Sequence, residues 1–252
     1  MRDISIILSV DDHHLDELSF SWQTWFKFKA KEFNSFKEFI IMFDKNQLNE
    51  NDDRFDFLRG YNVQLVPWPD KNELFSNQRS KMLTSLVYAP YFVKTDWYIK
   101  IDTDVIASNN KKWIFDDWFT GEYKFISNPW GYTKPSNAIQ ILDDWGDKIN
   151  SLSKYNRLNF PFNNEHKRIC HKRIISWLFV CDTDWSTYAA KLAEKYYGER
   201  ILPIPSQDTY LYYIAERTKQ KYKKVRFKKF GWHHISRYKK FKNKYREIMN
   251  NV

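Results

Sequence analysis

The stretch Asp96-Trp97-Tyr98-Ile99-Lys100-Ile101-Asp102-Thr103-Asp104-Val105 decides the fold that we expect for this chain. Its apolar part, 97–101, predicts a short buried strand that ends in two carboxylates one residue apart. In a parallel sheet flanked by helices, the carboxyl end of a strand opens into the crevice where ligands bind. Carboxylate ligands suit Mg²⁺ or Mn²⁺, ions that proteins usually share with substrate phosphates. An isolated Asp-x-Asp also occurs by chance at solvated strand ends, so its surroundings must decide its meaning.

Three apolar runs precede this stretch, at residues 4–10, 39–43 and 63–66, and predict strands buried on both faces. A helix with apolar residues at helical spacing follows the first run, and a short helix at 52–58 follows the second. This alternation of strands and helices is typical of a parallel, doubly wound sheet. We therefore expect an α/β fold, with one domain built on a Rossmann-like, mostly parallel sheet flanked by helices.

The composition of the chain restricts its class. Its 252 residues suffice for one large domain, and 19% aromatic residues argue against disorder. A net charge of +10 favours an anionic partner: a nucleotide, a nucleic acid or an anionic membrane surface. The two cysteines fit a reduced compartment. With no signal peptide and no long apolar run, we expect a cytoplasmic protein, peripheral on a membrane at most.

The second half of the chain predicts further elements. We expect strands near 124–127 and 173–181, with a turn at Asn128-Pro129-Trp130-Gly131 between them and a long polar connection at 146–172. A second Asp-x-Asp, Asp182-Thr183-Asp184, precedes a helical pattern, so we interpret Asp182 or Thr183 as its N-cap. Residues 225–234 predict a last strand that ends in paired histidines, and a closing helix follows from residue 236.

A predicted helix from residue 77 carries Arg79 toward the same crevice, ahead of the strand that ends in Asp-x-Asp. Free N–H groups and a guanidinium at a helix start favour phosphate. The ordered block from Arg79 to Asp102-Thr103-Asp104 resembles the GT-A glycosyltransferases, in which a helix bearing a nucleotide-contacting Arg or Lys precedes the Asp-x-Asp strand. This resemblance extends, strand by strand, over most of the chain.

The resemblance implies a donor site for a nucleotide-diphosphate sugar and a cofactor ion, Mn²⁺ or Mg²⁺. Asp104 would be the direct metal ligand, Asp102 would touch the ion or a sugar hydroxyl, and His234 would complete the metal shell. The remaining residues expected at the nucleotide sugar are Val10, Asp11, Asp44, Arg79, Thr103 and His233. For two of these acids the ordinary interpretation stays open, because Asp11 is also a natural helix N-cap and Asp44 a natural turn former.

The same resemblance places the acceptor on the other half of the chain. Asp208, expected in the first turn of a helix after Ser206, would be the general base that deprotonates the attacking hydroxyl. Simple capping by that carboxylate is the alternative. Gln207, Trp130 and Trp177 are the expected acceptor contacts. A base at Asp208 favours inversion of the anomeric centre.

We expect a glycosyltransferase domain at 1–235, with a donor-binding half at 1–110 and an acceptor-side half at 111–235, and a basic amphipathic helix at 236–252. The acceptor would be a glycan or a lipid-linked saccharide. Fourteen Lys or Arg residues between Arg217 and Arg246 could instead meet anionic lipid, nucleic acid or only water. The competing hypotheses are the same transfer onto nucleic-acid bases, or a metal-dependent nuclease or nucleic-acid-binding protein.

Overall fold

The computed structural model describes residues 3–69, 82, 86–132, 172–197, 220–235 and 238–250. The strands are β1 (Ile4–Val10), β2 (Glu38–Phe43), β3 (Val63–Pro67), β4 (Trp97–Ile101), β5 (Val105–Ala107), β6 (Phe125–Tyr132), β7 (Lys172–Asp182), β8 (Tyr222–Lys224) and β9 (Trp232–His234). The helices are α1 (Asp12–Phe28), α2 (Ala30–Phe33), α6 (Thr183–Tyr197) and α8 (Tyr238–Asn250). Short 3₁₀ turns are η1 (Asp53–Leu58), η3 (Ala89–Phe92), η4 (Asp116–Phe119) and η6 (Phe227–Phe230).

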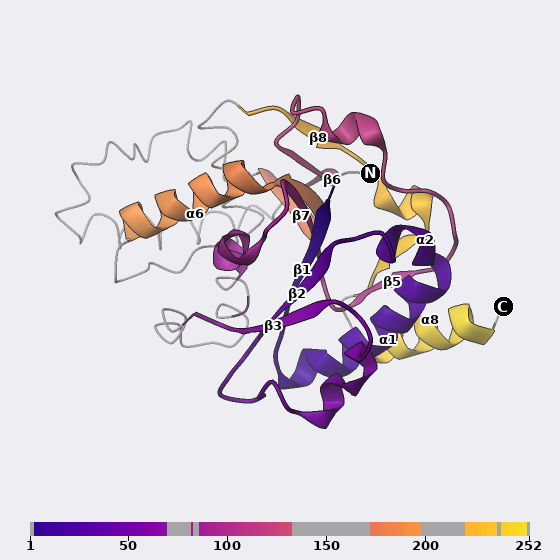
Figure 1. The fold of residues 1–252 in the computed structure, drawn as a ribbon. Helices are drawn as coiled ribbons and strands as arrows, with labels where there is room; N and C mark the ends of the chain where they lie inside the picture. The colour runs from indigo at the N-terminus through magenta and orange to yellow at the C-terminus, as the bar shows by residue number, and fades with distance from the viewer. Residues whose placement is uncertain are drawn as a thin grey trace.

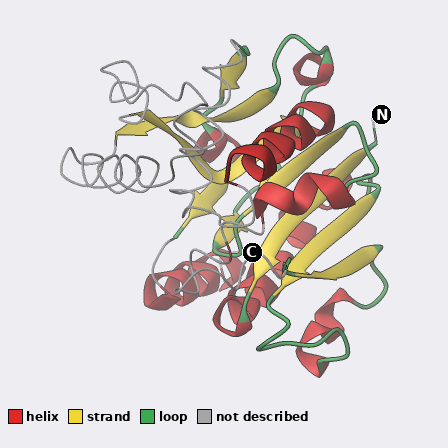
Figure 2. Cartoon of the chain, turned by 90° about the vertical axis from the view of Figure 1, so that its left-hand side faces the viewer, coloured by secondary structure: helices red, strands yellow, loops and turns green. Residues whose placement is uncertain are grey.

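Within these ranges, seven strands form one twisted sheet in the order β3-β2-β1-β4-β7-β6-β8. The strands β3, β2, β1 and β4 run parallel to one another, whereas β7 is antiparallel to both β4 and β6. The expected α/β fold with a mostly parallel sheet flanked by helices is confirmed. Helices lie on both sides of the sheet (Figures 1 and 2), with α1 on one side of it and α6 on the other.

The core forms where the apolar faces of the helices meet the sheet. The sequence pattern of α1 places four buried residues on one stripe: Leu15, Leu18, Trp22 and Trp25. They pack with alternate residues of β1, β2 and β4 and with rings from later in the chain, including Trp113 and Trp232. Since large rings bury much apolar area, this aromatic layer stabilises the sheet whose strand ends carry the loops of the site.

Two sequence predictions for the later strands are wrong. Residues 128–131, expected as a turn, belong to β6, which tolerates Pro129 because the β6–β7 register shifts on both sides of Asn128. The expected strand at 225–234 is broken into η6, a turn at Gly231 and the short β9. That break allows β9 to leave the main sheet and to pair instead with β5 in a two-stranded antiparallel sheet.

Candidate active site at the end of strand β4

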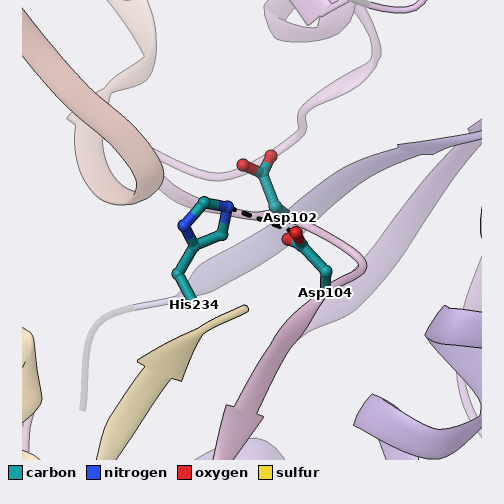
Figure 3. A group of neighbouring side chains, drawn as sticks. All are labelled: Asp102, Asp104 and His234. Atoms are coloured by element: carbon teal, nitrogen blue, oxygen red, sulfur yellow. Dashed lines mark ion pairs between the residues drawn. The ribbon is translucent and has the colours of Figure 1, made fainter. Parts of the chain in front are cut away.

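Three side chains meet at the carboxyl end of β4: two from the turn between β4 and β5, and one from β9. Asp102 follows β4 directly, the chain turns with the Val105 amide donating to the Asp102 carbonyl (3.2 Å), and Asp104 precedes β5. The pairing of β9 with β5 sets His234 opposite Val105. As a result one ligand atom each from Asp102, Asp104 and His234 lies within 4.8 Å of the others (Figure 3). His234 Nε2 is 3.2 Å from Asp104 Oδ2.

Helix α1 holds the loop that bears the two aspartates. The Ser21 hydroxyl donates to the Thr103 carbonyl (2.5 Å), and the Trp25 indole N–H donates to the Val105 carbonyl (2.7 Å). The Ala107 amide donates to the Thr24 hydroxyl (3.0 Å). All three donors and acceptors on α1 are buried, so leaving any of these groups unpaired would cost about 1–3 kcal/mol. The carboxylates are therefore presented on a rigid turn.

The charges at the site oppose one another. Burial raises the pKa of Asp102 and the nearby Asp104 charge raises it further, while the Lys100 ammonium, which forms an ion pair with Asp102, acts against both. Burial alone would lower the pKa of His234, but its hydrogen bond to Asp104 and the two carboxylate charges raise it overall. Because an imidazole must be neutral to ligate a metal, a proton and a cation compete for His234.

Trp177 fixes the orientation of this imidazole. Its ring is stacked on that of His234, with centroids 5.9 Å apart and planes 3° from parallel. Trp177 is 7% exposed and also contacts Phe227, while its backbone carbonyl accepts the Asp102 amide (2.8 Å). The expected acceptor contact thus lies at the site, where it supports two of the three clustered residues. Its buried position makes it a wall of the site more than an open stacking surface.

A buried lysine holds the turn before β9 in place. Lys29 is fully buried after α1, and its ammonium donates to the carbonyls of Lys111 (2.7 Å) and Phe230 (2.6 Å). Burial lowers the pKa of Lys29 to about 8. Gly231 follows with φ +84°, a conformation that glycine adopts without strain. Lys29 and Gly231 together aim β9, and hence His234, at the aspartates.

The nucleotide-binding residues expected at the ends of β1 and β2 make hydrogen bonds within the fold. Asp11 caps α1 by accepting from the His14 amide (2.9 Å) and also pairs with the His14 ring. Burial opposes the charge on Asp11, but those contacts lower its pKa overall. Val10 is fully buried and its carbonyl accepts the Asp44 amide (3.2 Å), while Asp44 Oδ1 accepts from Asn46 (3.0 Å). These positions shape the loops at the strand ends.

Two further expected residues make their hydrogen bonds with residues outside the cluster. Thr103 is 5% exposed, and its hydroxyl faces Glu17 of α1 (3.4 Å). His233 hydrogen-bonds the Ser108 hydroxyl (2.8 Å), and burial together with nearby lysines lowers its pKa. Arg79, Gln207 and Asp208 lie outside the described residues, as does the side chain of Trp130, whose backbone belongs to β6.

An open basic pocket adjoins His234. Its volume is about 410 Å³, and its lining comes from the turn before β9, from β9 itself and from α8: Lys228, His233, His234, Ile235, Lys240, Asn243, Lys244 and Glu247. The sequence showed the basic stripe of this region without showing that α8 returns to the site. It also gave no sign that His14 and Glu17 of α1 lie close enough to Asp104 for the charge of Asp104 to raise the pKa of both, although their spacing from the Asp11 cap places them on one helix face.

The donor set fits a divalent cation. Two carboxylates and one imidazole supply hard and borderline ligands, and three protein ligands leave positions for water or substrate oxygens. Lys228, Lys240 and Lys244 beside His234 favour an anion next to such an ion. The site can therefore hold a cation and a phosphate-bearing ligand side by side.

The fold of the chain is similar to the folds of several solved structures. Core-mannan synthase A from Aspergillus fumigatus, in its Mn/GDP form, superposes with a TM-score of 0.59 over 93% of this chain and 75% of its own, at 12% identity. The galactosyltransferase LgtC with donor and acceptor sugar analogues gives a TM-score of 0.55 at 10% identity, over 88% and 73% of the two chains. A 4-diphosphocytidyl-2C-methyl-D-erythritol synthase from Anaerococcus prevotii gives 0.52 at 12% identity, over 98% and 99%.

Sequence comparison alone finds no such likeness, since no protein-family model and no curated protein sequence matches the chain. The likeness therefore lies in the fold and not in the sequence. The chain has the GT-A, nucleotide-diphospho-sugar transferase fold.

Proposed function

We infer that the chain is a metal-dependent glycosyltransferase that moves a sugar from a nucleotide-diphosphate donor to a hydroxyl acceptor. The observation that supports this most is the cluster of Asp102, Asp104 and His234 at the carboxyl end of β4. A divalent ion held there, Mn²⁺ or Mg²⁺, supplies positive charge against the leaving diphosphate. The Mn/GDP form of the similar fungal synthase supports the choice of ion class.

In this proposal the residues of the chain have separate tasks. Asp104 and His234 hold the ion, and Asp102 holds it or a hydroxyl of the donor. The lysines of the basic pocket attract the diphosphate, and Trp177 keeps the imidazole in place. Arg79 would bind the nucleotide, and Asp208 would accept the proton of the attacking hydroxyl, with inversion as the outcome. Gln207 and Trp130 would contact the acceptor.

The acceptor that we propose is a glycan or lipid-linked saccharide, met in the cytoplasm or at an anionic membrane surface. No helix among the described residues is long and apolar enough to cross a bilayer. The exposed Arg246 of α8, which does not line the basic pocket, would contribute to any surface contact. Transfer to nucleic-acid bases is the alternative that uses the same donor site.

Donor hydrolysis tests the proposal. The chain is incubated with UDP-, GDP- and CMP-sugars with and without Mn²⁺, and free nucleotide is measured. Metal-dependent release from one donor is expected, and Asp104→Asn should reduce it at least about 100-fold because a metal ligand is lost. Asp117→Asn, at an exposed carboxylate paired with Lys223, is the matched control and should retain activity.

Three outcomes would contradict the proposal. Intact donors together with nicked DNA would indicate a nuclease. Pyrophosphate released from a nucleoside triphosphate would indicate nucleotidyl transfer on the same fold. Full activity of Asp104→Asn would remove the metal assignment.

A further inference from the structure

Lys100 lies buried behind Asp102. It belongs to β4, is 1% exposed, and its ammonium forms an ion pair with Asp102. The same ammonium is 6.0 Å from the centre of the Phe179 ring on the neighbouring strand β7. Residues two apart on a strand share a face, so Lys100 and Asp102 point the same way. The Asp102 side chain is 33% exposed, so Lys100 approaches the carboxylate from the interior and leaves its open side to a ligand.

A buried charge in this position destabilises the fold. Removing an ammonium from water costs several kcal/mol, which a pairing carboxylate offsets only in part. An apolar side chain of similar length would fill the same space beside Phe179 without that cost. Lys100 instead places a fixed positive charge within contact of a residue that could hold a metal.

The positive charge of Lys100 has opposite effects on the cation and on the diphosphate that the site would bind. It repels a divalent cation that approaches Asp102, and it attracts the negative charge of a diphosphate. When the cation and the diphosphate are both bound, the repulsion and the attraction that Lys100 exerts on them largely cancel. The binding order therefore depends on this residue.

We propose that Lys100 is a positioning residue: it serves as the internal counter-ion of Asp102 while no metal is bound, and it makes the metal enter together with the diphosphate instead of ahead of it. This inference depends on the proposed function, since it requires a metal and a nucleoside diphosphate at the same site. The carboxylate keeps its orientation in the empty site because Lys100 neutralises it from behind.

Lys100→Met tests this with two opposite expectations. Binding of Mn²⁺ alone, measured by the loss of its free electron-paramagnetic-resonance signal, should tighten by on the order of tenfold because a repulsive unit charge is removed. Binding of GDP or UDP without metal, measured by calorimetry, should weaken by a similar order. Binding of the nucleotide in the presence of saturating Mn²⁺ should change less than either. Local damage to the site would weaken all three.

Lys124→Met is the matched control. Lys124 forms a 2.8 Å ion pair with Asp182, which pairs with Trp97 at the opposite end of β4. The variant changes the net charge by the same amount and should leave both affinities within about twofold of wild type, because the removed charge is distant and screened. Lys100→Gln, which keeps a hydrogen-bond donor for Asp102, should show the same two opposite changes if Lys100→Met does not fold.

The outcomes separate this inference from the function on which it depends. Mn²⁺ binding that weakens or stays unchanged in both Lys100 variants, while wild type binds Mn²⁺ and nucleotide, overturns the role of Lys100 and leaves the transferase proposal intact. Wild-type protein that binds no Mn²⁺, with or without nucleotide, overturns both.

Discussion

Replacing Gly231 by alanine should damage both the stability of the fold and the proposed metal site. At φ +84° an alanine costs about 1–2 kcal/mol relative to glycine. Its Cβ would also lie 2.4 Å from Asn109 Nδ2 and 2.5 Å from Asn109 Cγ and Oδ1, so the whole amide must move. Because Asn109 Oδ1 accepts the Lys111 amide (3.1 Å), that movement loses a hydrogen bond of about 0.5–1.5 kcal/mol. The free energy of unfolding should fall by about 1.5–3.5 kcal/mol in total.

Urea unfolding of a double-mutant cycle checks this reasoning. Asn109→Ala should cost about 1 kcal/mol in the wild-type chain and close to nothing in the Gly231→Ala chain, where the hydrogen bond is already lost. Gly60 and Gly121 are matched controls, because both have φ +87° with nothing within 4 Å of an added Cβ. Alanine there should cost only the backbone part and leave Mn²⁺ affinity unchanged, whereas Gly231→Ala should weaken it by displacing β9. Additive effects at Gly231 and Asn109 would refute the steric argument.

Three other predictions concern stability. Trp25→Phe removes the donor to a buried β5 carbonyl and should cost about 1–3 kcal/mol more in urea unfolding than Trp113→Phe, whose indole N–H has no hydrogen-bond partner among the described residues. Equal losses would contradict this. For Lys29, whose folded-state pKa of about 8 lies below the 10.5 of the unfolded chain, the unfolded state binds more protons between these values. Wild type should therefore gain up to about 3 kcal/mol of stability, relative to Lys29→Met, as the pH rises through this range. A constant difference would show that the ammonium is not desolvated. Finally, the hydrogen bond to Asp11 raises the pKa of His14, so His14→Gln should cost most at about pH 5.5, and this cost should shrink as the pH rises through the raised folded-state pKa. A pH-independent cost in thermal melting would refute the ion pair.

The sequence predicted the fold best where strands are buried on both faces. The bounds of β1 and β4 agree with the apolar runs, because a buried parallel strand needs continuous apolar residues and ends where polar ones begin. The N-cap interpretation of Asp182 is also confirmed, since its carboxylate accepts the Trp185 amide (2.8 Å). Local chemistry decides such features, so local sequence is enough to find them.

Features that depend on distant pairing could not be read in the same way. The ladder between β5 and β9 is three residues long on each side and shows no period from which it could be predicted. The resemblance to GT-A enzymes suggested that His234 would join the aspartates, but the pairing that brings it there became visible only in the structure. Lys29 is similar, because a lysine between α1 and α2 gives no sign that it will be buried beneath two carbonyls.

The position of His234 on β9, near the end of the described chain, has a consequence for the folding of the protein during translation. Domains fold from the N-terminus as the chain emerges from the ribosome, and the sheet from β1 to β4 comes out long before Trp232. A nascent chain at that stage possesses both carboxylates and lacks the imidazole. If these three residues hold the ion that we propose, the full ligand set is therefore complete only after β9 has been made, and metal uptake during translation would report that β9 has paired with β5.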